Sequence, residues 1–213
     1  MSTAESSKPS LEALFDDFAH PNPQIKEQAY LKMAEYWPDE SMPRLLANLD
    51  QSDMVLRRAS VKALGAFGAR CFHPLVEIFQ TSDNRTVRTS CLKAFVQVAA
   101  KFPGINFPDE AMAVIERALE DDTPELTLTV VPLLPLLGNQ GLPLLLKSCK
   151  GENILRVAAA VTALGEVDDP SAKACLLELK NDDSIDQILR ESVVGALNTF
   201  EQRNPDATNS NSD

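Results

Sequence analysis

One helical segment recurs along this 213-residue chain, and the recurrence constrains the fold more than any other feature. In residues 55–68, VLRRASVKALGAFG, small and apolar residues recur at the spacing of one helix face, and glycines close the segment. Similar segments return at residues 86–96, 155–165 and 189–197. Because such a short helix cannot bury its apolar face alone, its copies must stack on one another. The sequence therefore predicts a helical repeat array.

Prolines set the period of the array. Pro43, Pro74 and Pro143 each stand 16 residues before the same position of the following recurring helix. Proline is favoured in the first turn of a helix, so we expect each of them to begin the first helix of a pair. The whole chain then contains about six helix pairs that repeat every 30 to 39 residues or so. The sequence is 6% aromatic and shows no β-type alternation, which also favours an all-α fold.

Some segments depart from this plan. Pro132 and Pro135 remove backbone hydrogen bonds inside the second helix of the fourth pair, so we expect a kink or break there. Residues 102–108 form an insertion and are the best candidate for a hinge. We expect a disordered lead at 1–9, a single solenoid at 10–202 and a disordered tail at 203–213. The bounds expected for individual helices include 11–18, 24–36, 109–120, 170–180 and 188–200.

Charge and cysteine content exclude several classes of protein. The net charge is −11 and the pI is near 4.7, which argues against nucleic-acid binding. Residues 40–105 are the exception, with 9 basic and 5 acidic side chains, and suit an acidic protein partner. The longest apolar run, residues 126–137, is too short for a bilayer and contains prolines, so no membrane insertion is expected. The 4 cysteines have no metal-ligand spacing and no signal peptide precedes them, which predicts reduced thiols in a cytoplasmic protein.

The repeated segments resemble a known family. The motifs DMVLRRASVKALGAFG, NRTVRTSCLKAF, NILRVAAAVTALGEV and ILRESVVGAL are similar to the short HEAT-like repeats of the cyanobacterial phycobilisome-lyase-like family. This resemblance implies a right-handed α-solenoid of HEAT-like helix pairs. It also implies a function among those of the family, which includes bilin lyase subunits, phycobiliprotein chaperones, a phycobilisome-degradation factor and a partner of an iron–sulfur scaffold.

Arginines that recur with the repeat are the first candidate site. Arg57, Arg88 and Arg190 follow acidic turns at the same register, and Arg156 lies one step away. They can present a cationic row to carboxylates of a partner, since arginine binds carboxylates in a bidentate manner. Alternatively they bond to the turn of a neighbouring repeat and fix the stacking. The second interpretation is favoured because the residue recurs with the repeat itself.

Further candidates lie on either side of these arginines. Arg58 and Lys62 add to the basic patch around residues 55–68. Tyr36 and Trp37 form either a hot spot for a partner or a cap on the end of the solenoid. The cysteines can bind iron or a bilin but fit core packing better. No cofactor and no metal site are predicted.

Two functions remain open at this point. The first is a non-catalytic protein-binding scaffold or chaperone-like adaptor, which the repeats and the lack of a catalytic constellation favour. By resemblance, its partner is a phycobiliprotein or a cofactor-assembly protein. The alternative is enzymatic: a bilin lyase subunit that attaches a bilin to a cysteine of a phycobiliprotein, in a hetero-oligomer with a second HEAT-like chain. Bilin is a cofactor under this alternative alone.

Overall fold

The computed structural model describes residues 8–121 and 123–204, which form helices and connecting loops without any strand. The chain divides into two compact units, Met1–Phe102 and Pro103–Asp213. The boundary falls at the start of the insertion predicted at residues 102–108. Whether residues 10–202 act as a single solenoid with a hinge at the insertion stays a prediction.

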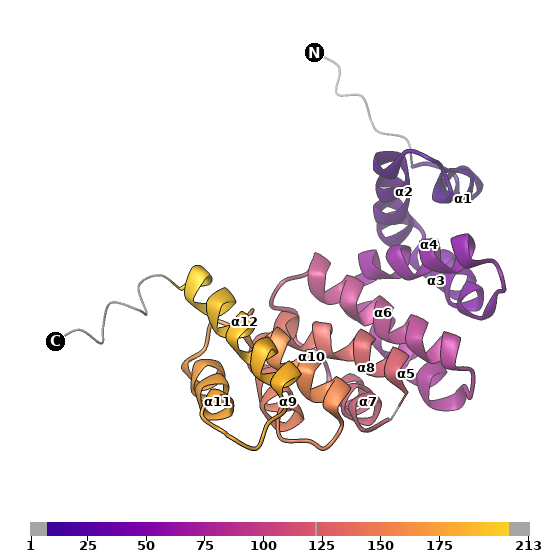
Figure 1. Cartoon of the computed structure of the whole chain (residues 1–213). Coiled ribbons are helices and arrows are strands. Elements are labelled where there is room, and N and C mark those ends of the chain that lie inside the picture. Colours follow the sequence, from indigo (N-terminus) through magenta and orange to yellow (C-terminus); the bar gives the residue numbers. More distant parts are fainter. Residues whose placement is uncertain (1–7, 122, 205–213) are drawn as a thin grey trace, which may run out of the picture. The chain divides into compact units, whose positions relative to one another are not determined.

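The first unit contains three helix pairs (Figure 1). The first helices of these pairs are α1 (Leu11–Phe18), α3 (Pro38–Ala47) and α5 (Phe72–Thr81). The second helices are α2 (Pro23–Tyr36), α4 (Met54–Leu64) and α6 (Arg85–Lys101). Two 3₁₀ segments, η1 (Asn48–Asp50) and η2 (Gly65–Cys71), extend α3 and α4. The second helices contact one another in the order α2, α4, α6, as stacked repeats require.

The second unit repeats the arrangement with three further pairs. Its first helices are α7 (Asp109–Glu120), α9 (Leu142–Ser148) and α11 (Pro170–Lys180). Its second helices are α8 (Pro124–Val130), α10 (Ile154–Leu164) and α12 (Gln187–Arg203), and a 3₁₀ segment, η3 (Val131–Gln140), follows α8. Figure 1 shows α10 between α8 and α12, and α10 contacts both. The predicted all-α solenoid of about six helix pairs is confirmed.

Polar caps explain where the second helices begin. Asp53 accepts hydrogen bonds from the backbone N–H groups of Val55 and Leu56, 2.8 and 3.1 Å away. Asn84, Asn153 and Asp186 cap α6, α10 and α12 in the same way. Each cap satisfies N–H groups that have no partner within the helix. The turns predicted before the recurring helices therefore carry the signal that starts them.

Glycine at the end of the recurring helix allows two neighbouring repeats to approach. A Cβ atom on Gly65 would lie 2.5 Å from the Cβ atom of Gln97 in α6. A Cβ atom on Gly165 would lie 2.6 Å from the carbonyl oxygen of Ala196 in α12. Both glycines have helical φ values, so their lack of a side chain matters for packing rather than for backbone conformation. The glycine of the Ala-Leu-Gly ending thus allows close packing between successive second helices.

Prolines act in two ways in this fold. Pro132 and Pro135 lie in η3, where α8 gives way to a 3₁₀ segment after seven residues, so the predicted break is confirmed. The prediction that Pro43 begins a helix is wrong. Pro38 occupies the first turn because Trp37, with φ −139° and ψ 43°, ends α2 directly before it, and the exposed Pro43 lies inside α3.

The ends of the described chain bear on the predicted lead at residues 1–9 and the predicted tail at 203–213. Residues 1–7 of the predicted lead and 205–213 of the predicted tail lie outside the described residues. Lys8 and Pro9 contact Trp37, and Arg203 completes α12.

Candidate protein-binding surfaces

Two of the recurring arginines bond to backbone carbonyl groups in the segment that directly precedes their own helix. The Nη1 atom of Arg57 donates a hydrogen bond to the carbonyl oxygen of Gln51, 2.6 Å away. Arg190 donates in the same way to the carbonyl oxygens of Lys180 and Asp182, at 3.5 and 3.2 Å. Both side chains are half-buried. These arginines hold backbone carbonyl groups, so they tie each segment to the start of the helix that follows it.

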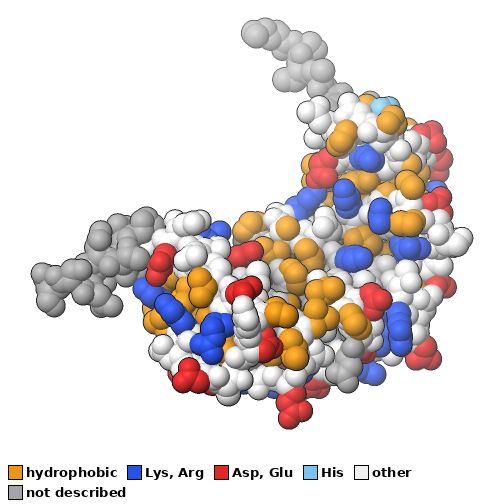
Figure 2. Space-filling view, viewed as in Figure 1, with side chains coloured by type: hydrophobic (Ala, Val, Ile, Leu, Met, Phe, Trp, Pro, Cys, Tyr) orange, Lys and Arg blue, Asp and Glu red, His pale blue; other side chains and the backbone are white. Residues whose placement is uncertain are grey.

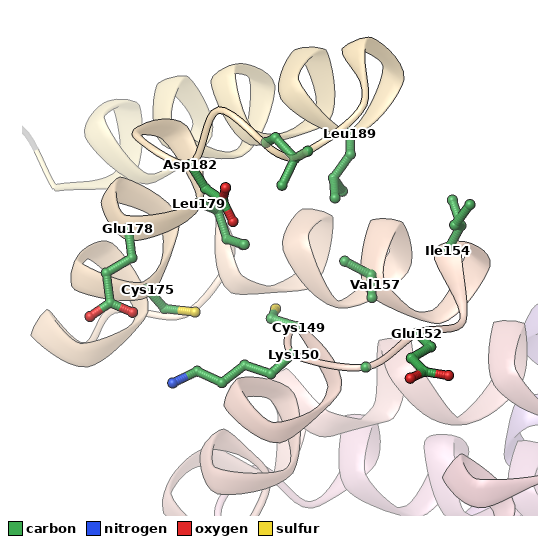
Figure 3. A pocket seen from close by; sticks show the side chains of 12 residues that line it. Cys149, Lys150, Glu152, Ile154, Val157, Cys175, Glu178, Leu179, Asp182 and Leu189 are labelled. Atoms are coloured by element: carbon green, nitrogen blue, oxygen red, sulfur yellow. The ribbon is translucent and has the colours of Figure 1, made fainter.

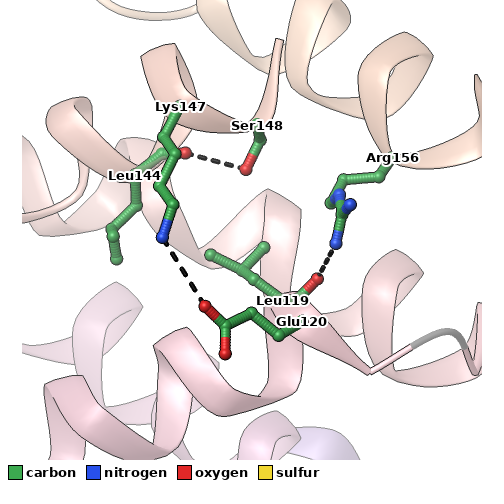
Figure 4. Close-up of polar contacts among 6 residues, drawn as sticks. All are labelled: Leu119, Glu120, Leu144, Lys147, Ser148 and Arg156. Atoms are coloured by element: carbon green, nitrogen blue, oxygen red, sulfur yellow. Dashed lines mark hydrogen bonds and ion pairs between the residues drawn. The ribbon is translucent and has the colours of Figure 1, made fainter. Parts of the chain in front are cut away.

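Arg88 and Arg156 make different contacts. The Arg88 guanidinium lies over the ring of Phe79 in α5, 4.5 Å from the ring centre. Arg156 donates a hydrogen bond to the carbonyl oxygen of Leu119, near the end of α7 (Figure 4). This bond joins the fifth helix pair to the fourth. The Arg156 bond fits the interpretation that the arginines fix the stacking, whereas the contacts described for Arg57, Arg88 and Arg190 lie within one helix pair. That interpretation and a role in binding a partner both stay predictions.

Arg58 and Lys62 differ from the four recurring arginines because they project freely. Both are exposed, and among the described residues neither side chain has a hydrogen bond or an ion pair. They stand four residues apart on α4, and Val55, which is 68% exposed, lies three residues before Arg58 on the same side of the helix. Figure 2 shows Lys and Arg side chains spread over the face of the first unit on which α4 lies. We call Val55, Arg58 and Lys62 the α4 stripe.

Tyr36 and Trp37 mark the junction between α2 and α3. The Nε1 atom of Trp37 donates a hydrogen bond to the carbonyl oxygen of Pro9, 2.9 Å away, and Lys8 lies over its ring. Tyr36 is half-buried, and a hydrogen bond with Glu35 raises the pKa of its hydroxyl. The segment before α1 therefore covers Trp37, and both interpretations of these two residues, a partner hot spot and an end cap, stay predictions.

Exposed apolar residues at the start of the second helices are a feature that the sequence interpretation missed. Val55, Leu155 and Ile188 each stand two positions after the cap residue of α4, α10 and α12, with exposed fractions of 68%, 39% and 74%. Ile154, directly before Leu155, is 65% exposed. The sequence does contain a signal for them, since an apolar residue recurs between the cap residue and the arginine. By type alone, however, this residue cannot be told from one buried in the core. Large apolar side chains left in water favour association with a partner.

Two cavities lie in the second unit. One, of about 420 Å³, is lined by residues that include Cys149 and Cys175 (Figure 3). The other, of about 360 Å³, is lined by residues that include Glu120, Lys147 and Arg156. Throughout residues 8–121 and 123–204, no group of three or more His, Cys, Asp or Glu side chains is placed to hold a metal ion.

All four cysteines are buried free thiols. Cys71 and Cys91 pack in the first unit, where burial raises the pKa of each thiol to about 12. Cys149 and Cys175 lie together in the second unit, although the sequence offered no spacing that linked them. Core packing thus accounts for Cys71 and Cys91, whereas Cys149 and Cys175 also face a cavity.

In the described part of the chain, no helix has the length and apolar character needed to cross a membrane.

The stacked helix pairs define an α-solenoid repeat protein, and comparison with known families gives the repeat type. Residues 111–198 match the model of HEAT repeats, and residues 56–81 match the model of the PBS lyase HEAT-like repeat. The second match begins inside α4 and covers η2 and α5.

Two curated relatives cover most of the chain. The bilin biosynthesis protein CpeZ of Synechococcus sp. (strain WH8020) is 35% identical over 79% of this chain and 94% of that protein. The uncharacterized phycocyanin operon protein Z of Pseudanabaena tenuis (strain PCC 7409) is 32% identical over 90% of this chain and 96% of that protein. The chain therefore belongs to the family of PBS lyase HEAT-like repeat proteins that includes CpeZ.

Among solved structures, a designed armadillo repeat protein in complex with the peptide (KR)4 is similar at 15% identity, with a TM-score of 0.46. The similarity covers 90% of this chain and 100% of that one.

Proposed function

We propose that this chain is a non-catalytic, chaperone-like scaffold that binds a phycobiliprotein. The observation that carries the proposal is the 35% identity to the bilin biosynthesis protein CpeZ across 94% of that protein. The relative from the phycocyanin operon, similar over 90% of this chain, supports the same connection with phycobilins.

The surface of the first unit supports binding rather than chemistry. In the α4 stripe, an apolar side chain and two cations project into solvent without partners among the described residues. A partner with an apolar contact point flanked by carboxylates would bury Val55 and pair with Arg58 and Lys62. Such pairing guides encounter and selects partners of the opposite charge.

The second unit contributes apolar contacts. Ile154, Leu155 and Ile188 are exposed at the start of two second helices that pack against each other. Scaffolds and chaperones use exposed apolar groups of this kind to hold incompletely assembled chains. On this proposal, an apo-phycobiliprotein subunit binds more tightly than the assembled, chromophore-bearing form.

Isothermal titration calorimetry of the purified chain against apo and holo phycobiliprotein subunits tests the proposal. We expect a stoichiometric complex with at least one apo subunit and no covalent change in either protein. The double variant Ile154→Ser, Ile188→Ser should weaken binding, whereas Leu177→Ser, at another exposed apolar residue on α11, should not. Failure to bind any apo subunit of the host would refute the scaffold function.

The alternative is a bilin lyase subunit. It is favoured by the 35% identity to CpeZ, which is described as a bilin biosynthesis protein. In this case the chain works with a second HEAT-like chain to attach a bilin to a cysteine of the phycobiliprotein. Co-expression with bilin, candidate apo subunits and a second HEAT-like chain distinguishes the two functions. A covalent, coloured product that requires this chain supports the lyase; a complex without covalent attachment supports the scaffold.

A further inference from the structure

Two thiols from consecutive helix pairs meet at one cavity of the second unit. Cys149 directly follows α9, and Cys175 lies in the middle of α11. Figure 3 shows the sulfur of Cys175 directed toward the loop after α9, which carries Cys149. Both cysteines line the cavity of about 420 Å³. The two helices also contact each other, which keeps the pair together in the fold.

The cavity gives small molecules access to these thiols. Its floor includes the buried side chains of Val157 and Leu189. Its rim carries exposed charged side chains, namely those of Lys150, Glu152, Glu178 and Asp182. A polar rim over a partly apolar floor admits a small polar molecule from solvent to the buried sulfur atoms.

The environment makes the two thiols chemically unequal. A hydrogen bond from Cys149 and, to a smaller extent, the ammonium group of Lys150 outweigh the opposing effects of burial and Glu178, so the pKa of Cys175 is lowered to about 7. The same hydrogen bond and burial raise the pKa of Cys149. Because the thiolate is the nucleophile, Cys175 is the attacking sulfur of the pair and Cys149 the resolving one.

We propose that Cys149 and Cys175 form a dithiol site that reacts with low-molecular-weight disulfides and closes to an internal disulfide. The Cys175 thiolate attacks one sulfur of the small disulfide, which breaks the S–S bond, forms a mixed disulfide and releases one thiolate. The Cys149 thiol then loses its proton, attacks the Cys175 sulfur and expels the second thiolate. The protein dithiol loses two electrons, the small disulfide becomes two thiols, and the two protons pass from the cysteines to the leaving thiolates.

The first unit supplies matched controls. Cys71 and Cys91 are free and buried like the pair, but neither lines this cavity. The thiol of Cys71 donates to the carbonyl oxygen of Gly68, 3.2 Å away. Their pKa values of about 12 leave almost no thiolate near neutral pH.

The test uses the full chain, reduced and then incubated with oxidised glutathione without oxygen. Peptide mass spectrometry should find Cys149 and Cys175 in one linked peptide pair, with a protein mass lower by about 2 Da for the two hydrogens lost. Cys149→Ser should stop at a glutathione adduct on Cys175, and Cys175→Ser should not react. Cys91→Ser should form the internal disulfide as the unchanged chain does.

A second measurement needs no variant and so does not depend on whether a substitution folds. In the folded, reduced chain at pH 7, alkylation by iodoacetamide should modify Cys175 at least about tenfold faster than Cys71 or Cys91. Equal rates at these three cysteines, or an unlinked pair after prolonged exposure to oxidised glutathione, would overturn the proposal. Neither measurement involves a phycobiliprotein, so its outcome is independent of the proposed scaffold function.

Discussion

Arg156, near the start of α10, donates a hydrogen bond to the carbonyl oxygen of Leu119, near the end of α7 (Figure 4). The carbonyl groups in the last turn of a helix lack partners within it and carry the negative end of its dipole. A guanidinium that satisfies one of them therefore stabilises the junction between two repeats. Arg156 stands one position before the register of the other arginines, and this shift accompanies its reach to a different helix.

Replacing Arg156 tests the strength of that junction. Arg156→Ala should lower the free energy of unfolding by about 1–3 kcal/mol, because it leaves a partly buried carbonyl group without its charged donor. Chemical denaturation followed by circular dichroism measures the change.

The nearby Lys147 provides the control. Its ammonium group lies 3.6 Å from a carboxylate oxygen of Glu120, and both side chains are at least 70% exposed. Lys147→Ala should cost about 0.5 kcal/mol or less, as expected for an ion pair in water. Equal costs for the two variants would contradict a structural role of Arg156.

The glycine that ends the recurring helix gives a second stability prediction. Gly165→Ala should destabilise the second unit by about 1–3 kcal/mol, since the new Cβ atom meets the backbone of Ala196 and forces α10 and α12 apart. Gly195→Ala is the matched control in the interior of α12, where a Cβ atom meets nothing within 4 Å. That substitution should stabilise the protein by about 0.5–1 kcal/mol, because alanine favours the helix. The midpoint temperature of thermal unfolding should thus fall for Gly165→Ala and rise for Gly195→Ala.

Local signals in the sequence predict the bounds of several helices. The expected ranges 11–18, 109–120 and 170–180 coincide with α1, α7 and α11, because caps and prolines mark both the starts and the intervening turns. The expected end of the recurring helix at residue 96 fell short of Lys101, since α6 continues for as long as Val98 and Ala99 find apolar neighbours in the core. Packing rather than propensity sets that end.

The functional surfaces were harder to predict. Cys149 and Cys175 are separated in sequence by all of α10, and they meet because α9 and α11 pack as first helices of consecutive pairs. Spacing along the chain cannot reveal such a pair. Likewise, Arg57 and Arg58 are neighbours in sequence, but one bonds to a loop and the other projects into solvent. The direction of each side chain around the helix decides between these roles.

Substitutions at the two neighbouring arginines of α4 should therefore have different effects: one on binding to a partner and the other on the stability of the fold. Reversing charge with Arg58→Glu and Lys62→Glu should weaken binding to an acidic phycobiliprotein by about tenfold or more, while the free energy of unfolding stays nearly constant. Arg57→Ala should instead destabilise the fold, because it removes the hydrogen bond to Gln51.

The pair Arg117→Glu and Lys180→Glu controls for the change in net charge, since it also reverses two cations and both residues are exposed, on α7 and α11 in the other unit. Calorimetric titrations of the three proteins give the affinities. Unchanged binding in the Arg58 and Lys62 variant would exclude the α4 stripe as the contact surface.

The reactivity of Cys175 should depend on pH in a way that Cys91 does not share. With a pKa of about 7, the thiolate fraction of Cys175 rises about tenfold between pH 6 and pH 8, so its alkylation rate should rise by the same factor. Cys91, with a pKa of about 12, should stay unreactive over this range. Rates at each cysteine follow from quenched alkylation and peptide mass spectrometry.

The charged groups on the cavity rim should move that pH profile in predictable directions. Lys150→Ala removes a cation that favours the thiolate, so the midpoint of the Cys175 profile should rise. Glu178→Gln removes an anion that disfavours the thiolate, so the midpoint should fall. Glu152 and Asp182 also line the cavity but are not among the causes of the Cys175 shift, so their amide variants should leave the midpoint in place. If neither the Lys150 nor the Glu178 variant moves the midpoint, the charged groups on the rim do not set the pKa of the Cys175 thiol.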